Sequence, residues 1–382
     1  MPTTANSIDA LLKPLVIGQL SMPNRFVMAP LTRCRADGEH VPTPAMVRHY
    51  ADRASMGLII TEATQIEKGY STFCHEGGIY GKEQVDGWRK VTDAVHEKGG
   101  LIFCQIHNGG RATVPSNVDE GVRIVAPSAV AITDHECPGA FARNGEKQPY
   151  PVPHEMTAED IALYVKLYAT AACNAMAAGF DGVEVHGANG YLIDEFLKSS
   201  SNQRTDEYGG SIENRCRFLF EVLDAVIKAI GRERVGLRIS PLNSFNNQSD
   251  ENPEALTRYI CSQLNSRNIS FLDLMRGDFF SQACGADKWA REAYEGVLFT
   301  GMGFEIAEAA ETVASGAADA VVFGTKALAN PDLVARAIAG AALNTPDPAT
   351  FYSTSEAGYN DYPSMVSSCP SAAAPSCTKE TS

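Results

Sequence analysis

The sequence DGVEVHGANGYLIDEFL (residues 181–197) joins a short apolar run, a tight turn and the beginning of a helix. Residues 181–185 predict a buried strand, and residues 193–197 predict the helix start. His186, Asn189 and Tyr191 lie on the connection between them. This position, directly after a strand in a strand–helix repeat, commonly carries catalytic groups. The segment therefore predicts one β/α unit with a functional site at its turn.

The same unit recurs along the chain, which predicts a parallel barrel. Eight short apolar runs alternate with stretches of helical period, as a (β/α)8 TIM barrel requires. The expected strands are residues 25–29, 57–61, 101–106, 182–185, 235–239, 270–274, 296–299 and 320–323. The expected helices are residues 44–55, 83–98, 157–178, 212–230, 253–266, 304–314 and 331–339. A doubly wound sheet is the runner-up, but Gly301-Met302-Gly303 is an isolated GxG without a third glycine.

Two segments depart from the barrel repeat. About fifty residues with six prolines separate the third expected strand from the helix at residue 157, which is too long for an ordinary β/α connection. We expect a loop insertion after strand 3, over the top face of the barrel and with a small hairpin. Residues 364–382 are small, polar and aperiodic. We therefore expect a barrel domain over residues 1–363 and a disordered C-terminal tail.

Charge and composition limit the possible partners. The 382 residues carry a formal net charge of -14, which argues against nucleic acid and anionic membrane surfaces. No apolar run approaches the roughly 20 residues of a membrane span, and the N-terminus lacks a secretion signal, so we expect a cytoplasmic protein. The ten cysteines are scattered without a CxxC pair, so we expect no metal site.

The turn that follows residue 185 carries the side chains needed for work on an oxygen-bearing substrate. The imidazole of His186 and the amide of Asn189 can donate hydrogen bonds to one carbonyl oxygen and stabilise charge on it. Tyr191 can supply a proton from the opposite side of the substrate. The alternative is a satisfied core histidine, a turn-forming asparagine and a packing tyrosine. Their clustering after one strand favours a site.

Other strand ends supply groups that suit a flat, phosphate-bearing cofactor. Thr32, Ala63 and Gln105 lie at the ends of the first three expected strands. Arg238 lies within an apolar strand, where it needs an anion or an electron-rich ligand. The segments TGMGF and FGTK, at the last two strands, offer glycine backbone N–H groups and Lys326 for a phosphate. This set fits FMN better than a nicotinamide dinucleotide.

Several motifs in a fixed order resemble the old yellow enzyme family of FMN-dependent ene-reductases. The matching segments, between Leu11 and Pro363, are MAPLTRCR, DRASMGLIITEATQI, HGANGYLIDEFL, YGGSIENRCRF, VGLRISP, FGTKALANPDLVAR and GYNDYP. The run MRGD, which begins at Met275, is most similar to the trypanosomatid branch, together with FGTK and GLRISPLN. That branch is linked to prostaglandin F synthesis and to quinone and nitro-drug reduction. The resemblance implies an NAD(P)H-dependent flavoprotein oxidoreductase with a small-molecule substrate, either a monomer or a homodimer.

The resemblance also implies roles for individual residues. The isoalloxazine ring would contact Ala29, Pro30, Thr32, Ala63, Gln105 and Arg238, and the phosphate would be held by Met302, Gly303, Gly324 and Thr325. His186 and Asn189 would bind the carbonyl oxygen of an α,β-unsaturated substrate. Its β-carbon would accept hydride from flavin N5, and Tyr191 would protonate the α-carbon. Tyr70 and Tyr359 would line the substrate pocket, and NADPH or NADH would reduce the flavin.

The chain departs from the common family pattern at two places. Gln105-Ile106-His107-Asn108 stands where many members have Gln-x-Trp-His, which alters one wall of the expected pocket. FGTK replaces the usual FGR, so Thr325 takes the place of the phosphate arginine and Lys326 follows it. Two other functions stay compatible with the residues alone. They are a flavin-independent TIM-barrel acid/base enzyme and a non-catalytic ligand-binding barrel.

Overall fold

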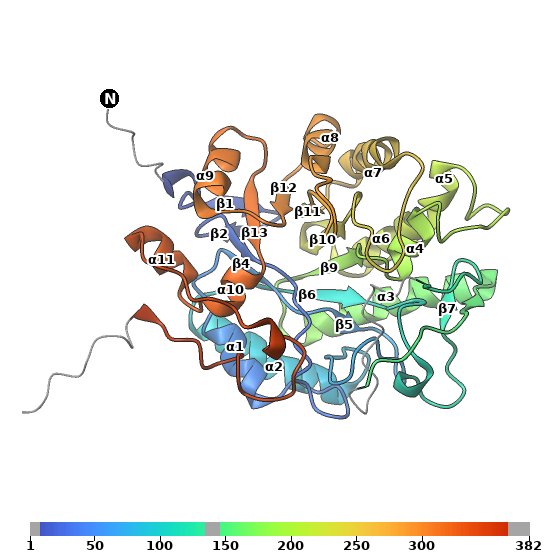
Figure 1. Cartoon of the computed structure of the whole chain (residues 1–382), viewed down its shortest axis with the longest axis horizontal. Helices are drawn as coiled ribbons and strands as arrows, with labels where there is room; N and C mark the ends of the chain where they lie inside the picture. Colours follow the sequence, from blue (N-terminus) through green and yellow to red (C-terminus); the bar gives the residue numbers. More distant parts are fainter. Residues whose placement is uncertain (1–7, 134–145, 366–382) are drawn as a thin grey trace, which may run out of the picture.

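Eight parallel strands close into a barrel in the computed structural model, which describes residues 8–133 and 146–365 (Figure 1). The strands are β3 (Phe26–Met28), β4 (Leu58–Ile60), β6 (Ile102–His107), β9 (Gly182–Gly187), β10 (Val235–Ile239), β11 (Phe271–Met275), β12 (Leu298–Gly301) and β13 (Ala320–Phe323). Strands that follow each other along the chain lie side by side, and the pairings of β13 with β3 and of β4 with β6 complete the ring. Each strand overlaps one expected run, so the predicted (β/α)8 barrel is confirmed.

Aromatic side chains fill the lower part of the barrel interior. The ring centroids of Phe103 and Phe271 lie 5.4 Å apart, and those of Phe271 and Phe299 lie 4.5 Å apart. Glycine makes room for them, because a Cβ atom at Gly236 would lie 2.3 Å from the Phe271 ring. Intervening residues such as Leu237 point the other way and belong to the core beneath the helices. This alternation is the two-residue period of strands that are buried on both faces.

Helices cover the outside of the barrel (Figure 1). They are α1 (Pro44–Ala51), α2 (Lys82–Glu97), α3 (Ala158–Ala177), α4 (Leu192–Leu197), α5 (Ile212–Arg215), α6 (Arg217–Ile230), α7 (Pro253–Arg267), α8 (Ala286–Ala293), α9 (Ile306–Ala314), α10 (Thr325–Ala329) and α11 (Leu333–Ala339). Two expectations were wrong. The single helix expected over residues 212–230 is divided by a turn at Cys216, and α8 and α10 occupy stretches for which no helix was expected.

A hairpin closes the bottom of the barrel. Its strands β1 (Leu15–Ile17) and β2 (Leu20–Met22) are antiparallel, and Ile17 and Met22 pack into the cluster that contains the interior aromatic rings. At the other end, β5 (Thr64–Gln65) continues beside β6. The chain therefore enters the fold from the end opposite to the predicted site.

The described part of the long insertion after β6 does not form the expected hairpin. Its two short strands, β7 (Val125–Ala126) and β8 (His154–Glu155), pair in parallel, whereas the strands of a hairpin must be antiparallel. Part of the insertion and nearly all of the tail expected to be disordered lie outside the described residues. Across residues 8–133 and 146–365, no helix is long and apolar enough to cross a membrane.

Candidate active site

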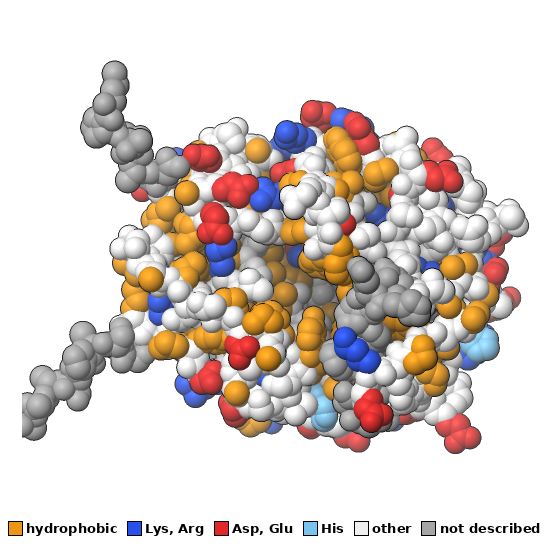
Figure 2. All heavy atoms as spheres, viewed as in Figure 1, with side chains coloured by type: hydrophobic (Ala, Val, Ile, Leu, Met, Phe, Trp, Pro, Cys, Tyr) orange, Lys and Arg blue, Asp and Glu red, His pale blue; other side chains and the backbone are white. Residues whose placement is uncertain are grey.

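Two adjoining cavities open at the carboxyl ends of the barrel strands. The glycine-rich cavity, about 340 Å³, is lined by Ala29, Pro30, Arg238, Met302, Gly303, Gly324 and Thr325 among others. The aromatic cavity, about 470 Å³, is lined by Pro30, Thr32, Ala63, Gln105, His186, Asn189 and Tyr191 among others. The cavities share Pro30, Leu31, Asn189 and Phe279, so they form one continuous hollow. Figure 2 shows a surface hollowed near its middle, with hydrophobic side chains around the opening.

Backbone forms one end of the glycine-rich cavity, in the loops after β12 and β13. Met302 and Gly303 both have left-handed backbone conformations, with φ angles of 89° and 73°. Methionine rarely adopts this conformation, and such strain is common at ligand sites. A Cβ atom at Gly303 would meet nothing within 4 Å, so the space beside it is open. Arg276, which the sequence did not indicate, supports the loop by donating from Nε to the carbonyl oxygen of Met302 over 3.0 Å.

Lys326 supplies a positive charge at the same end of the hollow. It follows Thr325 at the start of α10 and lines the glycine-rich cavity. Its Nζ lies 2.8 Å from Oε1 of Glu305, which balances part of the charge. An anion in this cavity would therefore compete with Glu305 for the lysine.

A layer of polar side chains crosses the barrel interior above the aromatic rings. Gln105 and Glu184 face each other on β6 and β9, and Nε2 of Gln105 lies 2.8 Å from Oε1 of Glu184. Arg238 and Asp273 face each other on β10 and β11 and form an ion pair. Burial raises the pKa of Glu184 well above its ordinary value, and the charge of Asp273 raises it further. Burial raises the pKa of Asp273 as well, but the charge and hydrogen bond of Arg238 oppose that rise. This arrangement favours the proton on Glu184 and the negative charge on Asp273.

Two residues that line the hollow each have a buried side-chain nitrogen with no hydrogen-bond partner within the described part of the chain. These atoms are Nε of Arg238 and Nδ1 of His186. Burying a polar group without a partner is costly. A ligand in the hollow can provide both partners, an electron-rich ring or anion at Arg238 and an oxygen at His186.

The three predicted turn residues come together on one wall of the aromatic cavity. The ring centroids of His186 and Tyr191 lie 5.4 Å apart, and Asn189 lines the same space. Burial lowers the pKa of His186 well below its ordinary value, and the charge of Arg238 lowers it further. The imidazole is therefore neutral at pH 7 and can act as a neutral hydrogen-bond donor.

His107 supports this wall from behind. Its ring centroid lies 4.8 Å from that of Tyr191 and 5.4 Å from that of His186, and it lines neither cavity. Burial lowers its pKa to about 3, so His107 is neutral as well. His107 stands where many family members have tryptophan, and it packs behind the rings of His186 and Tyr191 instead of lining the aromatic cavity.

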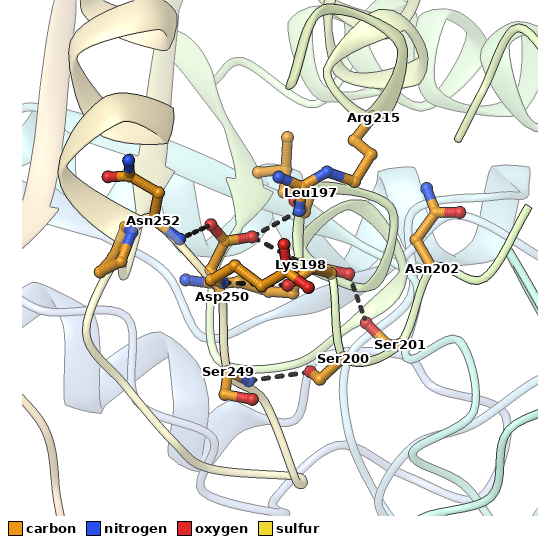
Figure 3. Close-up of polar contacts among 12 residues, drawn as sticks. Leu197, Lys198, Ser200, Ser201, Asn202, Arg215, Ser249, Asp250 and Asn252 are labelled. Carbon is orange, nitrogen blue, oxygen red and sulfur yellow. Dashed lines mark hydrogen bonds and ion pairs between the residues drawn. The ribbon is translucent and has the colours of Figure 1, made fainter. Parts of the chain in front are cut away.

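A network around Asp250 holds the polar segment that follows α4 (Figure 3). The carboxylate of Asp250 forms an ion pair with Arg215 and accepts hydrogen bonds from the backbone N–H groups of Ser199, over 3.0 Å, and of Asn252, over 2.9 Å. Lys198 is buried, and its Nζ donates to the carbonyl oxygen of Pro241 over 2.6 Å. These contacts tie the segment to α5, to the end of β10 and to the start of α7. They explain how a long polar stretch stays ordered beside the turn.

Two residues that the resemblance placed in the substrate pocket lie elsewhere. Tyr70 is fully buried, and its hydroxyl donates to the carbonyl oxygen of Gly110. Tyr359 is fully buried too, and its ring stacks on His49 with the centroids 4.0 Å apart. Neither lines the aromatic cavity, to which the C-terminal segment contributes Tyr352 instead.

Sequence reasoning missed most of the aromatic wall. The wall is formed by Phe73, Tyr150, Phe245, Phe279, Phe280 and Tyr352. These residues lie on loops far apart in the sequence, and Phe73 stacks on Tyr352 with centroids 5.7 Å apart. The local signal in the sequence was the adjacent pair Phe279 and Phe280, which the structure leaves 52% and 54% exposed. Two exposed phenylalanines in a row are a sign of a binding surface.

The fold and the hollow are those of a barrel enzyme that binds a phosphate-bearing cofactor at the carboxyl ends of its strands. Residues 10–344 match the NADH:flavin oxidoreductase / NADH oxidase family, and the chain belongs to this family. It is 82% identical over 365 residues to a probable flavin mononucleotide-dependent alkene reductase of Leishmania infantum, covering 96% of this chain and 100% of that protein.

Solved structures agree with this relationship. The old yellow enzyme from Trypanosoma cruzi is 43% identical and matches with a TM-score of 0.90, over 94% of this chain and 99% of its own. Morphinone reductase in complex with tetrahydroNAD is 40% identical and matches with a TM-score of 0.86, over 93% of this chain and 97% of its own.

The resemblance to the trypanosomatid branch of the old yellow enzyme family is thereby confirmed. The protein is a flavin-dependent oxidoreductase, its cofactor is FMN, and a nicotinamide nucleotide is its reductant. Of the functions left open by the residues alone, the flavin-independent enzyme and the non-catalytic barrel are not retained, because the family is one of flavin oxidoreductases.

Proposed function

We propose that this enzyme reduces activated C=C bonds of α,β-unsaturated carbonyl compounds. One observation carries the proposal. Asn189 lines both cavities, so a substrate oxygen bound at the turn would lie beside the cofactor. The names of two similar proteins, an alkene reductase and morphinone reductase, support a reductase of this kind.

FMN fits the hollow through the groups that lack protein partners. We infer that the flavin ring is held by Ala29, Pro30, Thr32, Ala63, Gln105 and Arg238, and the phosphate by Met302, Gly303, Gly324 and Thr325. The unpaired Nε of Arg238 supports a contact with an electron-rich ring. Lys326 takes over the charge of the missing phosphate arginine. Bound FMN supplies the hydride chemistry that the side chains cannot perform.

The side chains of the turn prepare the substrate. His186 and Asn189 donate hydrogen bonds to its carbonyl oxygen, and neutral donors in a buried site stabilise the negative charge that develops there. Tyr191 lies on the same wall and holds the hydroxyl proton that is delivered to the α-carbon. The surrounding aromatic rings favour flat, apolar substrates and exclude water.

The same site suits several classes of oxygen-bearing acceptor. Quinones, nitro compounds and prostaglandin precursors are further candidate substrates, and NADPH, with NADH as the alternative, is the proposed reductant. A cytoplasmic setting is supported by the cysteines of residues 8–133 and 146–365, all of which are free thiols.

A spectroscopic experiment tests the function directly. The purified protein should be yellow, should bleach when NADPH is added without air, and should recover its colour when an enone is added. A panel of enones, quinones and nitro compounds then ranks the acceptors. A colourless protein that cannot be reconstituted with FMN would overturn the proposal, and so would a reduced enzyme that no enone reoxidises.

A further inference from the structure

Almost all polar groups of Asn189 have hydrogen-bond partners within the protein. Its backbone N–H donates to Oγ of Ser240 over 2.8 Å, and its backbone oxygen accepts from Nδ2 of Asn246 over 3.0 Å. Its side-chain Oδ1 accepts from Nδ2 of Asn243 over 2.8 Å. Asn189 lines both cavities, so its Nδ2 amide is the group left to meet a ligand.

The orientation of the Asn243 side-chain amide is fixed by the backbone N–H of Phe279, which can only donate a hydrogen bond. The backbone N–H of Phe279 lies 3.3 Å from Oδ1 of Asn243. Because this end of the Asn243 amide must be the oxygen, the other end must be the donor Nδ2, which meets Asn189. Asn189 must then turn its own oxygen toward Asn243 and its Nδ2 away. These two hydrogen bonds therefore distinguish Oδ1 from Nδ2 in both asparagine side chains.

We propose that Asn243 is a positioning residue, which fixes Asn189 as a hydrogen-bond donor toward a substrate oxygen and takes its own orientation from Phe279. Asn243 is only 1% exposed and lines neither cavity, so it acts through Asn189. The proposal rests on the carbonyl-binding role of Asn189 in the proposed function. No local pattern signals it, because Asn243 lies 54 residues after Asn189.

The hydrogen bonds from Phe279 to Asn243 and from Asn243 to Asn189 form a relay. Phe279, at the start of this relay, also belongs to the wall of the hollow. Phe279 lies on the loop between β11 and α8 and lines both cavities. The preceding residue, Asp278, accepts hydrogen bonds from the backbone N–H and the hydroxyl of Ser244, each over 2.9 Å. The loop is thus fastened at two neighbouring points to the segment that carries Asn243. The aromatic wall and the donor at Asn189 are held as one unit.

The variant Asn243→Asp tests the relay because it should reverse the orientation of the Asn189 side-chain amide. A carboxylate has nearly the same shape but can only accept. One of its oxygens keeps the contact with Phe279, and the other obliges Asn189 to turn its Nδ2 inward and its Oδ1 toward the cavity. We expect the oxidised FMN holoenzyme to lose affinity for 4-chlorophenol by about tenfold or more, and affinity for 4-chloroaniline, which offers N–H donors, by less than about threefold. Both titrations are followed by flavin absorbance.

A matched control separates the effect of the reversed Asn189 amide from the effect of the added negative charge. Asn246→Asp adds the same negative charge and removes the contact with the backbone oxygen of Asn189, but it leaves the amide held by Asn243. We expect it to change both affinities by similar factors. Equal losses for the two ligands in Asn243→Asp, unchanged phenol binding, or the same change of ratio in Asn246→Asp would each overturn the relay.

A second variant keeps the proposal testable should Asn243→Asp fail to retain FMN. Asn243→Ala frees the Asn189 amide to turn either way, so the ratio of the two affinities should move in the same direction by a smaller factor. An unchanged ratio would overturn the relay. A wild-type holoenzyme that binds FMN but neither ligand would overturn the carbonyl-binding role of Asn189, and the relay with it.

Discussion

Arg238 and Asp273 face each other across β10 and β11 and form an ion pair inside the barrel. Asp273 is fully buried, so water screens its charge only weakly. Glu184 lies beside it and is kept protonated by burial and by the charge of Asp273. This group of three therefore carries one positive and one negative charge close to the proposed flavin ring.

The flavin reduction potential should respond differently to the two acids. Asp273→Asn removes the negative charge, so Arg238 should stabilise an anionic reduced flavin more strongly and raise the potential by on the order of tens of millivolts. Glu184→Gln replaces a neutral acid by a neutral amide and should change it little. Potentiometric titration of the three holoenzymes measures both shifts. A larger rise in Glu184→Gln would mean that Glu184, not Asp273, carries the charge.

Loss of the Tyr191 hydroxyl should separate the two halves of the catalytic cycle. In Tyr191→Phe, reduction of the flavin by NADPH needs no proton from this residue and should keep its rate. Reoxidation by a weakly activated enone should slow by about a hundredfold or more, the usual contribution of a general acid. Stopped-flow absorbance measures the two steps apart.

Tyr70→Phe is the matched control for that variant. It removes a tyrosine hydroxyl that donates to Gly110 and lines neither cavity, so both rates should stay near those of the wild type. Equal slowing of enone reduction in the two variants would show that Tyr191 is not the proton donor.

Substitution of Tyr359 should lower the stability of the enzyme, whereas substitution of Tyr352 should weaken substrate binding. Tyr359 packs on His49 and lies under the guanidinium of Arg35, whose carbon is 4.6 Å from the ring centroid. Tyr359→Ala should lower the free energy of unfolding by about 3 kcal/mol, as for other buried aromatic residues. Tyr352→Ala should instead raise KM for bulky enones. Urea unfolding and steady-state kinetics on both variants check this prediction. The reverse result would mean that Tyr359, not Tyr352, lines the substrate pocket.

The strands of the barrel could be predicted because their signal is local. Each is a short apolar run, and β10 and β13 even have the expected bounds. The helix α8 was missed because its sequence ADKWAREA is short and half of its residues are charged, with Ala286 and Ala290 as its buried residues. The direction of β7 and β8 depends on the path of the insertion between them, which no local pattern contains.

The site could be predicted only where barrel geometry brings strand ends together. Thr32, Gln105 and Arg238 lie far apart in sequence but line one hollow because parallel strands end on the same face. The C-terminal segment is placed instead by distant contacts. Arg35 donates to the carbonyl oxygen of Thr350 over 3.0 Å and to that of Ala357 over 3.2 Å. A motif locates such a segment in the sequence but does not give the direction of its side chains.

Buried acids should make the enzyme less stable as the pH rises, and Glu76 is a clear case. It is fully buried, its Oε2 has no partner in the described chain, and burial raises its pKa from the ordinary value of 4.5 to about 8. Between these two values the folded state binds more protons than the unfolded state. The free energy of unfolding should therefore fall with rising pH, by up to about 1.4 kcal/mol per pH unit for this one group.

Glu76→Gln should remove the contribution of this group to the slope. Its amide oxygen can still accept from the hydroxyl of Ser71, as Oε1 of Glu76 does over 3.0 Å, and it has no proton to lose. Urea unfolding at pH 5, 6, 7 and 8 should show a flatter decline than in the wild type, whereas Glu97→Gln, an exposed change on α2, should leave the decline unaltered. An identical slope in Glu76→Gln and the wild type would mean that Glu76 is ionised in the folded enzyme throughout this range, since a group links stability to pH only where the folded and unfolded states bind different numbers of protons.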